Sequence, residues 1–98
     1  MNTLELAVPA DHPAFAGHFP GRPMLPGALL LAQALQALAH AGVATRGRAV
    51  SSAKFLSPVA PGERVSLRWR QTPAGSLQIE LAVGERRVAS VVLAGEPR

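Results

Sequence analysis

The chain has 98 residues, of which 48% are hydrophobic and 16% are charged, and it carries a formal net charge of +4. This apolar content excludes a disordered chain, and the length suits a single core, so we expect residues 1–98 to form one domain. The sequence contains no cysteine, which excludes disulfides, thiol catalysis and cysteine-bound metal and fits a cytoplasmic protein. It does not open on a basic stretch followed by an apolar run, so we expect no signal peptide.

The positive charge suggests nucleic acid as a partner and the apolar stretch suggests a membrane, but each feature has a simpler explanation. The arginines fall mostly on alternate strand positions, as on a solvated strand face; Arg64, Arg68 and Arg70 alternate with Val65, Leu67 and Trp69. We therefore expect no nucleic-acid partner, and an acidic carrier protein suits these charges better.

The apolar stretch 24–44 contains polar residues and is barely long enough to span a bilayer. We expect a buried core helix there and no membrane contact.

The first predicted elements are a strand, a loop and a long helix. Alternating apolar residues over 4–8 predict the strand, and residues 9–23 form the loop. Pro26 suits the first turn of a helix over 27–41, whose residues are strong helix formers, and Gly42 is a suitable stop. This helix is apolar nearly all round, which predicts that other structure encloses it.

The rest of the chain is predicted to form four strands separated by turn residues: about 48–56, 63–71, 76–83 and 86–94. The third of these alternates most cleanly, with Leu77, Ile79, Leu81 and Val83 on one face. A long buried helix followed by an antiparallel meander is an α+β pattern.

Residues 17–27, GHFPGRPMLPG, form the most informative segment. Three prolines and three glycines in eleven residues hold His18 in a stiff loop directly before the helix. A neutral imidazole near pH 7 suits a general base, and the unpaired N–H of Gly27 at the helix start suits a developing oxyanion. The alternatives are a structural or solvated histidine and a Pro-Gly pair that merely starts the helix.

This segment resembles the GHFPGxPxxPG signature of the hotdog-fold 3-hydroxyacyl-thioester dehydratases of fatty-acid and polyene synthesis. Residues 54–63 (KFLSPVAPGE) and the lead-in 11–15 extend the resemblance to about three-quarters of the chain. It implies an α+β hotdog fold, with one long central helix wrapped by an antiparallel sheet of about five strands. The short lead-in is similar to the compact members associated with aryl-polyene pigment pathways.

The resemblance also implies the roles of particular residues. His18 would take the proton from the carbon beside the thioester carbonyl, and Gly27 would donate a hydrogen bond to the carbonyl oxygen. The expected substrate-binding residues are Phe19, Pro26, Gln33 and Gln36. We expect no cofactor and no metal, because the histidines are scattered and lack matching carboxylates; His12 and His40 are set aside as incidental.

One position departs from the family pattern. The family has Glu or Asp fourteen residues after the histidine, where this chain has Ala32. The acid protonates the leaving hydroxyl, which alanine cannot do. Gln33 lies about 100° round the helix and holds no titratable proton, so it is no simple substitute. Gln36 matches a glutamine that the family commonly carries, which shows that the alignment has not slipped.

Four interpretations stay open. The chain is a subunit that dehydrates 3-hydroxyacyl groups on acyl carrier protein, in a heterodimer whose other subunit supplies the acid. Alternatively, it is a homodimer that works slowly with water or Gln33 in place of the acid. It is otherwise a non-catalytic subunit that holds an acyl chain or completes a dimer, or, less favoured, an acyl thioesterase. A monomer would leave the sheet edge and the site half-built, so we expect a dimer.

Overall fold

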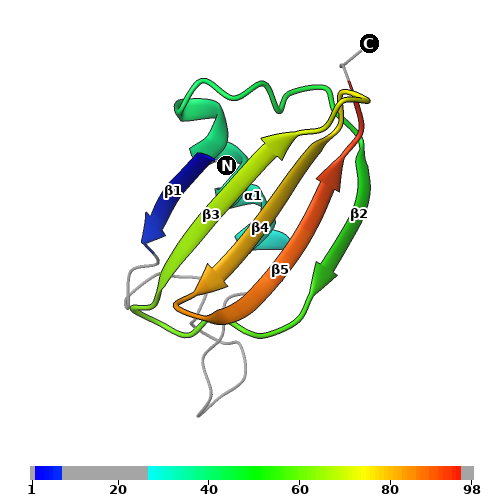
Figure 1. Cartoon of the computed structure of the whole chain (residues 1–98). Coiled ribbons are helices and arrows are strands. Elements are labelled where there is room, and N and C mark those ends of the chain that lie inside the picture. The colour runs from blue at the N-terminus through cyan, green and yellow to red at the C-terminus, as the bar shows by residue number, and fades with distance from the viewer. Residues whose placement is uncertain (1, 8–26, 96–98) are drawn as a thin grey trace.

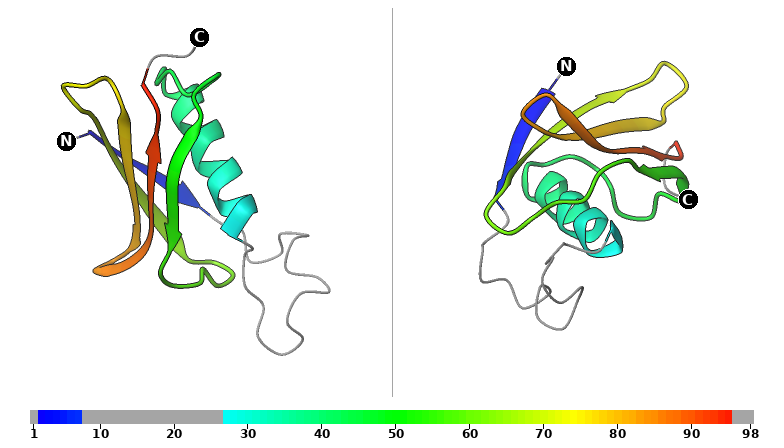
Figure 2. Two further views of the ribbon diagram at one scale, coloured as in Figure 1. Left: turned by 90° about the vertical axis from the view of Figure 1, so that its right-hand side faces the viewer. Right: turned by 90° about the horizontal axis from the view of Figure 1, so that it is seen from below.

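The computed structural model describes residues 2–7 and 27–95, which form one helix and five strands (Figure 1). The elements are β1 (Asn2–Ala7), α1 (Gly27–His40), β2 (Val50–Phe55), β3 (Arg64–Gln71), β4 (Leu77–Val83) and β5 (Arg86–Leu93). The strands form one antiparallel sheet, and α1 packs against its concave face (Figure 2). The predicted α+β arrangement of one helix and five strands is confirmed.

The strand order is β1-β3-β4-β5-β2, so β1 and β2 lie at the two edges of the sheet. The predicted meander is correct for β3 to β5 but wrong for β2, which pairs with β5 and not with β3. The connection over 56–63 is too long for a tight hairpin. At its start, the N–H groups of Leu56 and Ser57 both donate to the carbonyl of Val88, at 2.8 and 3.3 Å. The chain therefore continues along β5 before it reaches β3.

The core lies between the inner face of the sheet and one row of α1. The helix contributes Leu30, Ala34 and Leu38, each at most 2% exposed. These positions repeat every four residues and therefore form a single stripe. The predicted alternation in β3 and β4 is confirmed, with the arginines of β3 exposed on the outer face. The buried strand residues are Val65, Leu67, Trp69, Leu77, Ile79, Leu81, Val88, Ala89, Val91 and Leu93.

The opposite side of α1 is open in the single chain. Ala28, Ala32, Gln36 and Ala39 are exposed. The prediction that other structure encloses this helix is therefore met on one side only, because a single sheet covers only the stripe that faces it. No helix in the described ranges has the length and hydropathy needed to cross a membrane.

β2 is the more open edge of the sheet. All six of its residues are exposed, and the large apolar side chains of Val50, Phe55 and the following Leu56 are 47%, 48% and 55% exposed. β1 differs, because its exposed and half-buried residues alternate and its Glu5 pairs with Arg64. An exposed edge strand offers unpaired backbone groups to another chain, so β2 is the better candidate for contact with a second subunit.

Candidate functional site

Gly27 is the first residue of α1, as the sequence predicts. Its N–H group precedes the hydrogen-bond ladder of the helix and has no partner within it. The ring of Phe55 in β2 covers its Cα, since a Cβ added to Gly27 would lie 3.1 Å from the Cγ, Cδ1 and Cε1 atoms of that ring. Real Cβ contacts are rarely so short. Packing against Phe55 therefore favours glycine at this position, whatever its predicted role toward a substrate.

Three of the predicted site residues, His18, Phe19 and Pro26, lie outside the described residues. The role of His18 as a base, and the contribution of the other two residues to substrate binding, therefore stay predictions.

Gln33 and Gln36 both line an open hollow of about 290 Å³ between α1 and β1. Its lining residues are Leu6, Ala7, Gln33, Gln36, Ala37 and His40. The structure thus brings the two predicted glutamines together, but Gly27 packs against Phe55 of β2, at the other edge of the sheet. His40, set aside as incidental from the sequence, lies in the same hollow. Its spacing of four residues from Gln36 and seven from Gln33 is the signal that predicts this shared side of the helix.

Position 32 lies on the exposed side of α1, one turn before Gln36. The half-buried Gln33 lines the hollow beside β1, on a different side of the helix from position 32. The whole of α1, with the sequence GALLLAQALQALAH, contains no acidic residue. A carboxyl group at this place must therefore come from outside the helix.

Glu63 is a carboxylate with a shifted pKa. Its Oε1 accepts a hydrogen bond from the N–H of Ala60 at 2.7 Å, and both of its oxygens lie 2.8 Å from Nη2 of Arg86. The Ala60 hydrogen bond is the main cause that lowers the pKa of Glu63 below its usual value near 4.5; burial opposes this shift and Arg86 adds to it. Such a group is ionised near neutral pH and is therefore poorly suited to act as a general acid.

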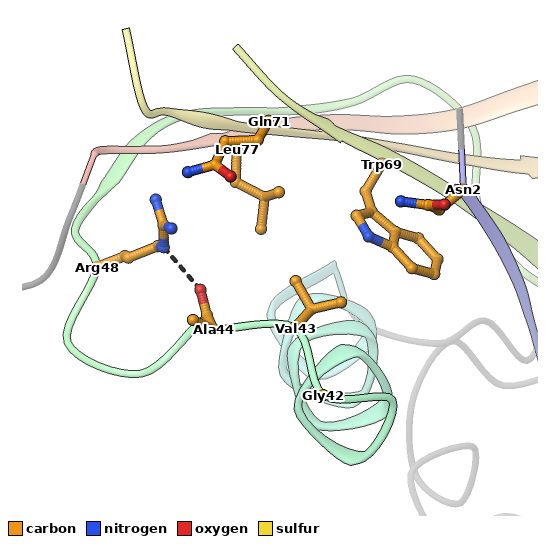
Figure 3. A pocket seen from close by; sticks show the side chains of 8 residues that line it. All are labelled: Asn2, Gly42, Val43, Ala44, Arg48, Trp69, Gln71 and Leu77. Atoms are coloured by element: carbon orange, nitrogen blue, oxygen red, sulfur yellow. Dashed lines mark hydrogen bonds between the residues drawn. The ribbon is translucent and has the colours of Figure 1, made fainter. Parts of the chain in front are cut away.

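A second hollow of about 320 Å³ lies at the C-terminal end of α1 (Figure 3). Its only charged lining residue, Arg48, is engaged with the backbone. Nε donates to the carbonyl of Ala44 at 2.7 Å, and Nη1 donates to the carbonyls of Gly75 and Ala94, both at 2.9 Å. These bonds fasten the segment after the helix to the end of the sheet, which is a structural role. In the described part of the chain, no group of three His, Cys, Asp or Glu residues is placed to hold a metal ion.

Sequence comparison finds relatives along most of the chain. The model of the ApeI-like family, described as ApeI dehydratase, matches residues 1–92. The 3-hydroxyacyl-(acyl-carrier-protein) dehydratase FabZ of Anaeromyxobacter sp. (strain Fw109-5) is 37% identical over 73 residues, which cover 62% of this chain and 46% of the relative. FabZ of Haemophilus ducreyi is 37% identical over 70 residues, with 61% and 46% covered. The chain spans somewhat less than half the length of these relatives.

Several solved structures share the fold of this chain. An uncharacterized protein from Erwinia carotovora subsp. atroseptica is 29% identical, with a TM-score of 0.71 over 97% of this chain and 82% of that one. The dehydratase heterocomplex ApeI:P from Xenorhabdus doucetiae is 21% identical, with a TM-score of 0.70 over 93% and 82%. A variant of the fluoroacetyl-CoA-specific thioesterase FlK is 14% identical, with a TM-score of 0.65 over 95% and 84%. The last two show the fold alone, and the predicted hotdog fold is confirmed.

Proposed function

Because the chain belongs to the ApeI-like dehydratase family, we propose that it takes part in the dehydration of 3-hydroxyacyl thioesters carried by an acyl carrier protein. The observation that carries the proposal is the family match over 1–92, which includes the whole segment 17–27 and the helix that begins at Gly27. The FabZ relatives, named as dehydratases of acyl-carrier-protein substrates, support the substrate class. Acyl chains of fatty-acid or polyene-type synthesis are the proposed substrates.

In the proposed reaction, the imidazole of His18 accepts a proton from C2 of the acyl chain. The electron pair of the broken C2–H bond forms the double bond between C2 and C3, and the C3 hydroxyl leaves as water. The N–H of Gly27 donates to the thioester oxygen, which gains negative charge as the proton leaves. The departing hydroxyl needs a second proton donor, and Ala32 cannot act as one.

A partner subunit is the proposed source of this acid. Position 32 is exposed, α1 carries no acidic residue, and β2 presents an open sheet edge on which a second chain can pair. The structural neighbour from Xenorhabdus doucetiae is described as a dehydratase heterocomplex, which supports partnering of unlike subunits. A homologue with Glu or Asp at the position of Ala32 would complete one composite site with His18.

The test is the dehydration of a short 3-hydroxyacyl thioester, or the reverse hydration of an enoyl thioester. Wild type and His18→Ala are each assayed alone and with an acid-bearing homologue. We expect little activity from the chain alone, high activity from the wild-type complex, and loss of the activity of the composite site with His18→Ala. Equal rates for His18→Ala and wild type in every combination would contradict the enzyme proposal.

A non-catalytic subunit that binds an acyl chain is the second candidate, since it accounts for Ala32 directly. A third possibility is a slow homodimer that uses water or Gln33 in place of the acid. Unlike a non-catalytic subunit, it would show activity when the chain is assayed alone. The likeness to the thioesterase FlK concerns the fold and gives no support to thioester hydrolysis. The cysteine-free sequence fits the proposed cytoplasmic location, which cell fractionation tests.

A further inference from the structure

We propose that Phe55 is a specificity-determining residue that forms one wall of the thioester site at the start of α1. This inference rests on the proposed function, because it takes the N–H of Gly27 as the group that binds the thioester oxygen. It adds a residue from β2 to the N–H group of Gly27 at the start of α1.

The contact between Phe55 and Gly27 has a defined geometry. The Cβ position of Gly27 is equally distant, at 3.1 Å, from three consecutive ring atoms, Cγ, Cδ1 and Cε1. A point that is equally distant from three atoms of a planar ring lies over the face of that ring. The face of the ring therefore covers the place where a side chain on Gly27 would begin. The pairing of Phe55 with Ala89 of β5 fixes the strand position from which the side chain extends.

The same ring has surface left for a ligand. In the single chain Phe55 is 48% exposed and is not part of the buried core, so part of its ring stays open to a ligand wherever the proposed second subunit does not cover β2. A thioester oxygen bound by the N–H of Gly27 would lie about 3 Å from that nitrogen, and the nitrogen is about 1.5 Å from the Cα whose Cβ position the ring covers. The atoms beside the thioester carbonyl would therefore pass close to the ring. This predicts a preference for acyl groups that are unbranched at C2.

The experiment compares Phe55→Ala and Phe55→Leu with wild type, in the complex that shows activity. Leu56→Ala is the matched control, because Leu56 is the adjacent large apolar residue and is 55% exposed. Hydration kinetics are measured with a linear enoyl thioester and with its 2-methyl analogue, and sedimentation velocity checks the assembly. For Phe55→Ala we expect the ratio of kcat/KM for the branched to the linear substrate to rise about tenfold, which is the usual effect of one methylene in a pocket. We expect a smaller rise for Phe55→Leu and none for Leu56→Ala.

A double-mutant cycle tests the contact without any assay of activity. Gly27→Ala should lower the Tm of the wild-type protein, because the new Cβ meets the ring. In the Phe55→Ala background it should leave the Tm unchanged or raise it, because space is available and alanine favours a helix. If the effects of the two substitutions on the Tm add, the two residues do not interact, and the proposal is overturned.

The outcomes separate this proposal from the proposed function. Wild-type activity with an unchanged substrate ratio in Phe55→Ala would overturn the role of Phe55 alone. Failure of the wild-type complex both to turn over the thioesters and to bind an unreactive thioether analogue would overturn the proposed function, and the role of Phe55 with it.

Discussion

Ala32 is exposed on α1, so a larger side chain has room at this position. We expect Ala32→Glu to raise the dehydration rate of the chain alone by about 100-fold, because general acid assistance typically contributes at least this factor. The free energy of unfolding should change by no more than about 0.5 kcal/mol, as for other surface substitutions. Ala28→Glu, one turn earlier in the same exposed row, is the control and should leave the rate unchanged. An equal rate for wild type and Ala32→Glu would show that the missing acid is not what limits activity.

Glu63 should make stability depend on pH. Its pKa is lower in the folded chain than in the unfolded one, so its contribution is complete above the unfolded pKa and is lost as pH falls through the folded pKa. We expect Glu63→Gln to cost about 1 kcal/mol at pH 7, since Arg86 is partly exposed and the ion pair is screened. The cost should shrink as pH falls below the usual carboxylate range near 4.5. Urea unfolding between about pH 3 and about pH 7, which brackets the ordinary pKa of a carboxyl group, measures this. Glu5→Gln, in an exposed pair, is the control.

At the scale of elements, Arg48 connects three segments that are distant in sequence. One guanidinium bonds the carbonyl of Ala44 after α1, that of Gly75 in the β3–β4 turn and that of Ala94 after β5. We expect Arg48→Met to lower the free energy of unfolding by about 2 kcal/mol, because partly buried carbonyls lose a charged donor. Arg46→Met removes an equal charge from an exposed position and should cost less than about 0.5 kcal/mol. Similar costs for the two variants in urea denaturation would contradict the structural role of Arg48.

At the scale of the whole molecule, the open side of α1 and the exposed β2 motivate the prediction that this chain pairs with a second subunit. We expect Val50→Lys to weaken subunit association about tenfold or more, because it places a charge on the exposed apolar edge. Thr3→Lys, at an exposed position on the opposite edge strand β1, should leave association unchanged. Sedimentation velocity at several concentrations measures both. Dissociation by Thr3→Lys, with Val50→Lys unaffected, would place the interface at β1 instead.

Features that depend on residues close together in the chain were predicted correctly from the sequence. The alternation of apolar residues over β3 and β4 predicts their buried faces, because each strand residue points to the opposite side from its neighbour. The helix starts at Gly27 as the Pro-Gly pair predicts. The segment 17–27 identifies the family, but its residues 17–26 lie outside the described residues. The roles of His18, Phe19 and Pro26 therefore stay predictions.

The sequence by itself therefore determined the elements, the buried faces of β3 and β4 and the family, because these depend on spacing within short segments. Only the tertiary structure decided that β2 pairs with β5 and that the ring of Phe55 packs against Gly27. It also decided that His40 joins Gln33 and Gln36 in one hollow and that Arg48 binds the carbonyls of three separate segments. These contacts join residues whose relative positions depend on the path of the whole chain, and the pattern of residues within one element does not predict that path.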